Sequence, residues 1–246
     1  MAVHFIHIPK TGGTGIRTLL GEGGRPETPY GPIRLHKHSW TLQRLRPGDY
    51  AFFCVRAPVP RFVSAFYSRL RKGQPRYFYE WLPEEREAFA RFPTPQALAS
   101  ALADDDPAAI KAMGDIQHVN AHQHHSVSRR DLQRKADQIL FIARTEHLNR
   151  EWPLLKKAVG LPAHLELPTD PVVTHRNPYA PQELDGRGKA AIRSWYARDL
   201  RIVRLCEEIR RQRAMIARPP GGRAGVLLRR GVAAGRAALR SAARER

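Results

Sequence analysis

Three short apolar runs along the chain have the character of β-strands, and each is followed by a segment with helical spacing. Residues 3–8 alternate and stop at a proline, while 51–55 and 138–142 are mostly continuous apolar stretches, which is typical of strands buried in a parallel sheet. Strand, loop and helix in this order predict an α/β fold with three layers around a central parallel sheet.

The second half of the chain is predicted to be helix-rich, with prolines marking the ends of its elements. Residues 79–125 have helical spacing interrupted by prolines, and a long last helix is expected over about 181–215. By contrast, residues 21–34 are rich in Gly and Pro. This stretch is therefore expected to be an irregular excursion without a strand of its own.

The basic charge of the chain is divided between a body and a tail. The 246 residues carry 42 Lys+Arg against 23 Asp+Glu, a formal net charge of +19. A Pro-Pro-Gly-Gly break at 219–222 predicts a domain over residues 1–217 and a separate tail over 218–246. The tail contains eight Arg and one Glu. It is either a basic amphipathic helix on an anionic membrane surface or a solvated appendage.

Composition excludes several classes of protein. The chain is 42% hydrophobic and can bury a core, yet no run approaches the roughly 18 apolar residues that a membrane span needs. The N-terminus lacks the pattern of a signal peptide, and Cys54 and Cys206 form no disulfide framework or metal motif. These features predict a cytoplasmic protein, and the Arg/Ala-rich composition favours a bacterial one. The charge surplus calls for an anionic partner.

The most informative motif is a glycine loop between the first strand and its helix. Glycines let backbone N–H groups curl around an anion, and a lysine and two threonines add side-chain donors. The Walker pattern does not fit because the lysine precedes the glycines, and no G-x-G-x-x-G is present. A glycine turn without a ligand is the alternative interpretation. The loop consists of Pro9, Lys10, Thr11, Gly12, Gly13, Thr14 and Gly15.

A second candidate anchor follows the second strand. Arg56 comes at the strand end, where open α/β sheets bind their ligands, and Ser64 lies about two turns into the next helix. A guanidinium fork and a hydroxyl that converge from strand and helix suit a phosphate monoester. Arg61, between them, is either part of this anchor or a structural residue.

The two motifs together resemble those of sulfotransferases that use 3′-phosphoadenosine 5′-phosphosulfate (PAPS), most closely the carbohydrate branch that includes heparan sulfate 2-O-sulfotransferase. Pro-Lys-Thr-Gly-Gly-Thr is similar to the P-loop-like 5′-phosphosulfate loop, and Val-Arg-x-Pro-x-x-Arg-x-x-Ser to the 3′-phosphate motif. The resemblance implies that Lys10 balances charge on the leaving phosphate and that residues 11–15, Arg56 and Ser64 bind the donor. Two positions depart from the family pattern, Gly15 in place of Ser and Ala57 in place of Asp.

Beyond about residue 70 the resemblance is thinner. The family closes a late basic or hydroxyl-bearing loop over the donor, and Thr174 and Arg176 are candidates for that lid. The segment Arg187-Gly188-Lys189 is a second candidate. The chemistry implied for the family needs no metal, and adenosine 3′,5′-bisphosphate is the other product.

Two histidines just before the second strand are candidates for the chemistry. An alcohol attacks poorly while it keeps its proton, and an imidazole has a pKa suited to removing it. In an extended segment His36 and His38 share a face, so both rings are expected to point into one cleft. The carbohydrate branch has a similar His-x-His, which implies His38 as general base and His36 as its helper or an acceptor contact. Surface histidines in a polar loop are the alternative.

The other histidines have several interpretations. His118, His122 and His125 fall at helical spacing, which is compatible with a metal face, with an acceptor-lining surface that includes Gln117 and Asn120, or with a polar helix end. The metal set lacks a nearby carboxylate or cysteine to complete it, so no metal site is predicted. His4 and His7 lie on opposite faces of the first strand and are expected to be packing residues.

The sequence therefore predicts a PAPS-dependent sulfotransferase that acts on a hydroxyl of a carbohydrate or lipid acceptor by in-line displacement. A P-loop phosphotransferase is the rival enzyme, although the Walker lysine is misplaced. A basic nucleic-acid-binding protein would explain the charge but not two ordered phosphate anchors, and no nucleic-acid motif is present. A protein that binds the donor without transfer is a further alternative.

Overall fold

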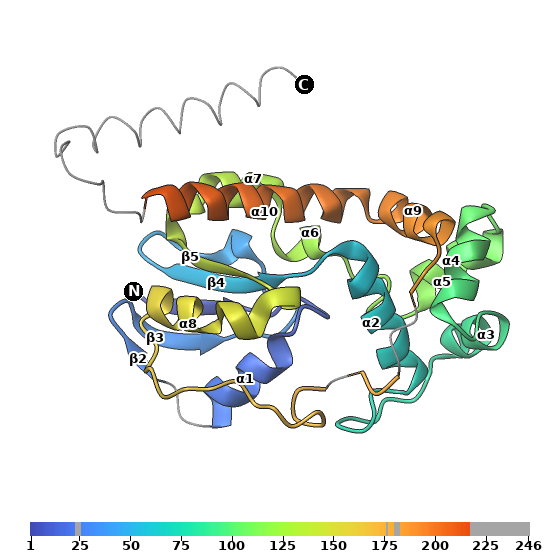
Figure 1. Ribbon diagram of the computed structural model, residues 1–246, viewed down its shortest axis with the longest axis horizontal. Coiled ribbons are helices and arrows are strands. Elements are labelled where there is room, and N and C mark those ends of the chain that lie inside the picture. The colour runs from blue at the N-terminus through green and yellow to red at the C-terminus, as the bar shows by residue number, and fades with distance from the viewer. Residues whose placement is uncertain (23–25, 176, 180–182, 217–246) are drawn as a thin grey trace, which may run out of the picture. The chain divides into compact units, whose positions relative to one another are not determined.

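A five-stranded sheet forms the centre of the computed structural model, which describes residues 1–22, 26–175, 177–179 and 183–216. The strand order is β2-β3-β1-β4-β5, and all neighbouring pairs are parallel except β2 with β3 (Figure 1). Residues Met1–Cys206 form one compact unit, and a second unit begins at Glu207. The strands are β1 (Val3–Ile6), β2 (Glu27–Thr28), β3 (Gly31–Leu35), β4 (Tyr50–Val55) and β5 (Ile139–Arg144).

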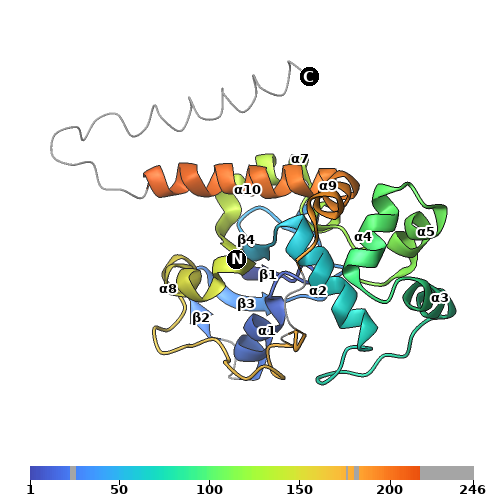
Figure 2. The same cartoon turned by 45° about the vertical axis from the view of Figure 1, so that its right-hand side comes forward.

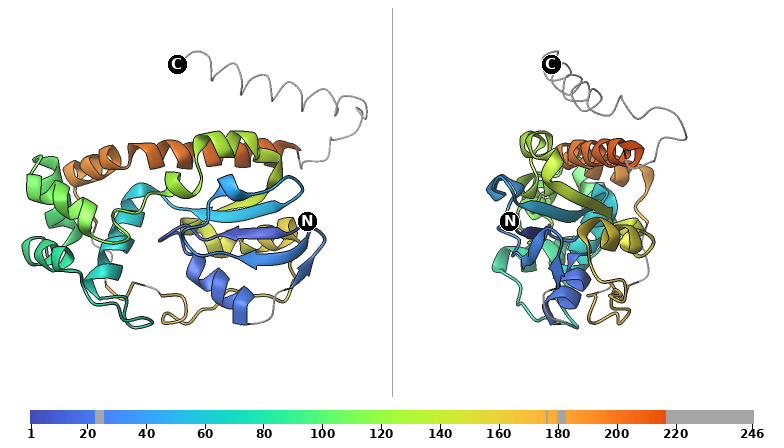
Figure 3. Two further views of the ribbon diagram at one scale, coloured as in Figure 1. Left: turned by 180° about the vertical axis from the view of Figure 1, so that it is seen from behind. Right: turned by 90° about the vertical axis from the view of Figure 1, so that its left-hand side faces the viewer.

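Helices cover both faces of this sheet. On one face, Val3 and Phe5 of β1 and Phe52 of β4 pack against α1 (Gly13–Glu22) and α8 (Leu148–Val159) in one hydrophobic cluster. Over the opposite face lie α7 (Arg129–Arg134) and the part of α10 (Ala197–Ile216) that precedes Glu207 (Figures 1 and 3). The alternation of side chains along each strand thus supplies apolar groups to both helical layers.

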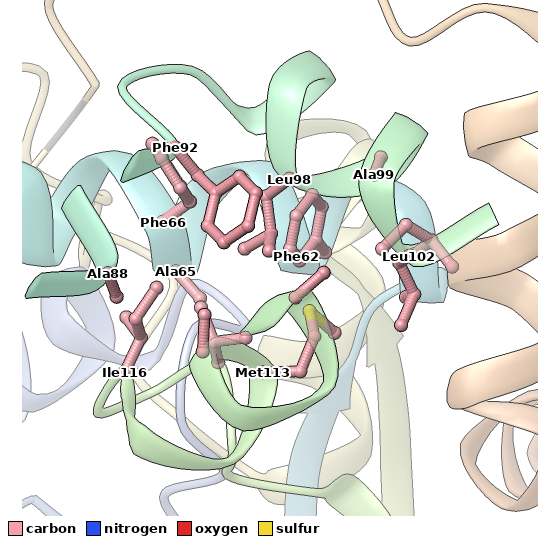
Figure 4. Packing of buried hydrophobic residues seen from close by; sticks show 14 of the residues in the cluster. Phe62, Ala65, Phe66, Ala88, Phe92, Leu98, Ala99, Leu102, Met113 and Ile116 are labelled. Atoms are coloured by element: carbon pink, nitrogen blue, oxygen red, sulfur yellow. The ribbon is translucent and has the colours of Figure 1, made fainter. Parts of the chain in front are cut away.

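A second hydrophobic core is built mainly by helices, to one side of the sheet (Figure 2). Phe62 and Phe66 of α2 pack there against Phe92, Met113 and Ile116 (Figure 4). Four of its helices begin with proline, which suits a first turn where no backbone donor is needed. The helices are α2 (Pro58–Leu70), α3 (Pro83–Arg91), α4 (Pro95–Ala103), α5 (Pro107–Asp115) and α9 (Gly186–Trp195).

The structure bears out the α/β class and the mostly parallel sheet, and corrects two expectations. The stretch predicted as irregular contains β2 and all of β3 except Leu35, and β3 pairs with β1, so the sheet has two more strands than the sequence indicated. The long last helix is two helices, α9 and α10, separated at Tyr196. Within the described ranges no helix has the length and apolar character needed to cross a membrane. The predicted tail and Arg176 lie outside the described residues.

Candidate active site

A cavity of about 1080 Å³ opens at the carboxyl ends of β1 and β4. From β1 the chain continues to β3 on one side, whereas β4 and β5 lie on the other side, so the order of the sheet reverses between β1 and β4. Open α/β sheets bind their ligands at such a point. The glycine loop leaves β1 here and the second anchor leaves β4, so the topology brings both predicted anchors to one place.

The glycine loop presents part of its length to the cavity. Lys10, Gly12, Gly13 and Thr14 are in the lining, and α1 begins at Gly13, so the free N–H groups of its first turn face the same region. Thr11 instead is buried, and its hydroxyl donates to the carbonyl oxygen of Ile8 at 2.9 Å. Pro9 and Gly15 are likewise outside the lining.

Two residues of this loop have left-handed backbone conformations, Lys10 with φ of 64° and Gly12 with φ of 80°. Gly13 is needed for a different reason. A Cβ atom there would lie 2.4 Å from Cδ2 of His7, whose ring packs behind the loop. The loop therefore fits tightly around the His7 ring, and its curvature follows from glycine at the positions where side chains cannot be accommodated.

The second anchor places Arg56 and Ser64 in the same cavity. Arg56 donates from Nη1 to the carbonyl oxygen of Lys10 at 3.3 Å, which links the two anchors directly. Among the described residues its buried Nε has no hydrogen-bond partner. Arg61 is fully buried and outside the lining, its Cζ lies 4.7 Å from the ring centroid of Tyr196, and its Nη1 donates to the carbonyl oxygen of His118. These contacts favour the structural alternative, although Nε and Nη2 of Arg61 have no hydrogen-bond partner among the described residues.

A third segment, which the sequence analysis did not single out, holds the anchors together. Thr145 follows β5, and its hydroxyl lies 2.7 Å from the carbonyl oxygen of Thr11 and 3.2 Å from that of Val55. Next to it, Glu146 accepts a hydrogen bond from the backbone N–H of Ala57 at 2.8 Å. The signal was available in the sequence, because the carboxyl ends of neighbouring parallel strands meet at one edge.

The cavity is strongly cationic. Burial, together with the nearby charges of Arg71, Arg56 and Arg61, lowers the pKa of Lys10 to about 7. The Lys10 amine is therefore about half protonated near pH 7. An anion bound at the loop would raise this pKa again, so that the amine becomes fully protonated. The other cationic residues in the lining are Arg17, Lys37, Arg69, Arg76 and Lys189. This arrangement suits a ligand with several negative charges.

His38 and His36 have different surroundings. His38 lines the cavity, and its Nδ1 lies 2.7 Å from the carbonyl oxygen of His7. His36 is outside the lining: its Nε2 lies 2.8 Å from Nδ1 of His4, and its ring stacks on Trp40 at 4.2 Å. The expected shared cleft is therefore not found, because β3 ends at Leu35 and the chain turns at 38–39.

Three further histidines line the cavity: His7, His118 and His175. Burial is the largest cause that lowers the pKa of His7 and of His118 to about 3, and that of His175 to about 4, so all three are neutral at pH 7. His7 had been expected to be a packing residue. It packs against Phe5 and against His38, whose ring centroid lies 4.2 Å away, and also reaches the cavity.

The helical face proposed for His118, His122 and His125 does not exist, because α5 ends at Asp115 and α6 covers only Gln123–Ser126. Of the residues in the acceptor-lining alternative, Gln117 and His118 are in the cavity lining, whereas His122, His125 and Asn120 are not, and Asn120 donates to the carbonyl oxygen of Gly114. These residues therefore belong to a loop and a short helix with separate roles.

His122, His124 and Asp199 place possible metal-ligand atoms within 4.8 Å of one another. Hydrogen bonds account for much of this arrangement. Asp199 accepts from Nδ1 of His124 at 2.6 Å and from the backbone N–H groups of Gln123 and His124 at 3.0 Å each. Both carboxylate oxygens are thus engaged within the protein.

Only some of the residues predicted to form a lid over the donor line the cavity. Thr174 lines the cavity, and its hydroxyl donates to the carbonyl oxygen of Asp170 at 2.8 Å. Of the second candidate segment, Lys189 is in the lining, whereas Arg187 pairs with Asp104. Arg176 cannot be assigned a place, since it lies outside the described residues.

Comparison with known proteins identifies the family. A model described as the sulfotransferase family matches residues 2–202, a range that contains the two anchors, the Thr145 segment and His38. Searches of curated proteins and of solved structures found no match. Because the family model covers well over half of the chain, the chain belongs to the sulfotransferase family, whose enzymes transfer a sulfuryl group from a donor to an acceptor.

Proposed function

We propose that this enzyme uses PAPS as donor and transfers its sulfuryl group to a hydroxyl of a carbohydrate or lipid. The observation that carries the proposal is the meeting of Lys10 and Arg56 in one cavity, each on its own strand-to-helix junction. PAPS has a phosphosulfate at one end and a 3′-phosphate near the other. The buried Nε of Arg56, which has no partner in the described part of the chain, fits a donor with that second phosphate.

The two ends of the donor are assigned to the two anchors. Gly12, Gly13 and Thr14 offer backbone N–H groups to the 5′-phosphosulfate, and Lys10 adds a charge beside the bridging oxygen. Arg56 and Ser64 take the 3′-phosphate. Thr174 remains a proposed donor contact, and the buried Thr11 contributes its backbone rather than its hydroxyl.

His38 is the proposed general base. It removes the proton of the acceptor hydroxyl while the acceptor oxygen forms a bond to sulfur and the bond from sulfur to the phosphate oxygen breaks. Lys10 and the loop amides stabilise the charge that develops on the departing phosphate. His36 receives no catalytic role in this proposal, because its ring is paired with His4 outside the cavity.

The proposed class of acceptor is argued from residues that line the cavity. Tyr77, Tyr79 and Tyr179 line it and are exposed, so they present flat apolar faces of the kind on which sugar rings or lipid groups pack. The assignment to the carbohydrate branch rests on the resemblance of the motifs. A cytoplasmic location and contact between the tail and a membrane surface stay predictions from the sequence.

Thermal unfolding with adenosine nucleotides tests the donor class. Adenosine 3′,5′-bisphosphate, the product of PAPS, is expected to raise the unfolding temperature more than 5′-AMP or ATP with Mg²⁺ does, because ligands that bind only the folded state stabilise it. Lys10→Ala is expected to reduce that shift. A larger shift with ATP would favour the rival phosphotransferase, and equal shifts with all three nucleotides would refute PAPS as the donor.

A further inference from the structure

Arg56 lies one residue beyond the end of a β-ladder. The pairing of β4 with β5 ends at Val55 and Arg144, so the backbone of Arg56 needs hydrogen-bond partners from elsewhere. Gln123 supplies both of them. Its Oε1 accepts from the N–H of Arg56 at 3.0 Å, and its Nε2 donates to the carbonyl oxygen of Arg56 at 2.8 Å.

These two bonds fix the base of the Arg56 side chain and leave part of its guanidinium available. Nη1 reaches the carbonyl oxygen of Lys10, while Nε has no partner among the described residues. A cation whose backbone is held in place loses less conformational freedom when it binds an anion. Gln123 is itself fully buried, which makes its amide unavailable for any solvent-facing role.

Gln123 is held in turn by Asp199, from the first turn of α10. The fully buried carboxylate of Asp199 accepts from the backbone N–H of Gln123 and, through its other oxygen, from the backbone N–H and Nδ1 of His124. A chain of hydrogen bonds therefore runs from α10 through Gln123 to Arg56 and on to Lys10 of the glycine loop.

We propose that Gln123 and Asp199 are positioning residues that hold Arg56 in place for the 3′-phosphate of the donor. This inference rests on the proposed function, in which Arg56 binds that phosphate. Neither residue lines the cavity, so both act through Arg56. Loss of the pair is then expected to weaken recognition of the 3′-phosphate while recognition of the 5′ end is kept.

Titration calorimetry with adenosine 3′,5′-bisphosphate and 5′-AMP tests the proposal. The two ligands differ only in the 3′-phosphate. The Kd of 5′-AMP divided by the Kd of the bisphosphate therefore measures how strongly the protein recognises that phosphate. Gln123→Met removes both bonds to Arg56 and is expected to reduce this ratio by about 10-fold to 100-fold, since small displacements of a binding group cost that much. In an Arg56→Ala background the same change is expected to have no further effect on the ratio.

The matched control is Gln138→Met. The amide of Gln138 donates to the carbonyl oxygens of Arg46 and Asp49, at 2.6 and 2.8 Å, and Gln138 is not in the cavity lining. This variant loses comparable bonds and is expected to keep the ratio. Asp199→Asn keeps the shape of the side chain and removes its charge. It is the alternative test variant if Gln123→Met does not fold. It is expected to reduce the ratio in the same direction.

The outcomes separate the inference from the function on which it rests. A wild-type enzyme that binds both nucleotides equally would overturn the donor assignment and this proposal with it. If the wild-type enzyme prefers the bisphosphate and the Gln123 and Asp199 variants keep that preference, the positioning role alone is refuted. The role is also refuted if the losses from Gln123→Met and Arg56→Ala simply add.

Discussion

Nδ1 of His38 lies 2.7 Å from the carbonyl oxygen of His7. A carbonyl oxygen only accepts hydrogen bonds, so Nδ1 carries the proton and Nε2 of the neutral ring has a free lone pair. Burial, with contributions from Arg17 and Lys10, lowers the pKa of His38 below its ordinary value of 6.5. The ring is therefore neutral at pH 7, as a general base must be before it takes a proton.

His38→Asn tests this role, because the asparagine amide can donate to the same carbonyl oxygen but has no basic nitrogen. We expect kcat to fall by about 10²- to 10⁴-fold and the Kd of adenosine 3′,5′-bisphosphate to change little. With the wild-type enzyme, kcat is expected to be constant above pH 7 and to decrease below the lowered pKa of His38. The exposed His164 provides a control, since His164→Asn is expected to keep wild-type kcat. A variant at His38 with full kcat contradicts the assignment.

The lowered pKa of Lys10 predicts that donor binding depends on pH. Its pKa of about 7 means that above pH 7 the unliganded protein has largely lost this charge, and an anion at the loop raises the pKa again. Binding of the bisphosphate at pH 8 is then expected to take up close to one proton, and the Kd to increase about fivefold between pH 7 and 8. Calorimetry in buffers of different ionisation enthalpy measures the uptake.

Lys10→Arg is the matched variant for this effect, because a guanidinium stays charged throughout the range. Its Kd is expected to be flat between pH 7 and 8. Proton uptake that persists in this variant would assign the effect to another group, and its absence in the wild-type enzyme would show that Lys10 does not have the lowered pKa.

Two glycines of the loop are expected to respond in opposite ways to alanine. In Gly13→Ala the new Cβ would meet Cδ2 of His7 at 2.4 Å, and that ring is packed against Phe5 and His38. In Gly15→Ala the nearest atom is Cγ2 of Thr174 at 3.7 Å, an ordinary contact, and the position is helical.

Thermal unfolding is therefore expected to show a clear loss of stability for Gly13→Ala, and for Gly15→Ala no loss or a gain of about 0.5–1 kcal/mol, because glycine is a poor helix former. Equal effects of the two substitutions would mean that the loop does not pack around His7 in this way.

Thr145→Val tests whether the third segment ties the anchors together. The substitution keeps the shape of the side chain but leaves the carbonyl oxygens of Thr11 and Val55 without this donor. The expected loss is about 1–3 kcal/mol in the free energy of unfolding, together with weaker binding of the bisphosphate. Thr28→Val is the control, since its hydroxyl donates to Gly31 in the turn between β2 and β3. That control is expected to change stability and to leave the Kd unchanged.

The sequence was informative where local patterns decide the structure. Apolar runs predicted β1, β4 and β5. The two strand-to-helix motifs predicted that Lys10 and Arg56 lie close together, and both residues line one cavity. The strand β3 was missed because its sequence, Gly-Pro-Ile-Arg-Leu, has the turn residues of a loop and becomes a strand through its pairing with β1.

Contacts between distant segments could not be read from local patterns. His7 looked like a packing residue, and only the curvature of the loop over its ring brings it to the cavity. The bonds from Gln123 to Arg56 span 67 residues, and those from Asp199 to the backbone N–H groups of Gln123 and His124 span 76 and 75. Such partners are set by tertiary packing, which no short motif records.

The preference of the wild-type enzyme for a 3′-phosphate tests the central claim most directly. Titration calorimetry gives the Kd values of adenosine 3′,5′-bisphosphate and 5′-AMP under identical conditions. The charged hydrogen bonds offered by Arg56 predict that the bisphosphate binds at least about 10-fold to 100-fold more tightly. Arg56→Ala is expected to remove this preference. Equal Kd values for the two nucleotides in the wild-type enzyme would contradict the assignment of PAPS as donor.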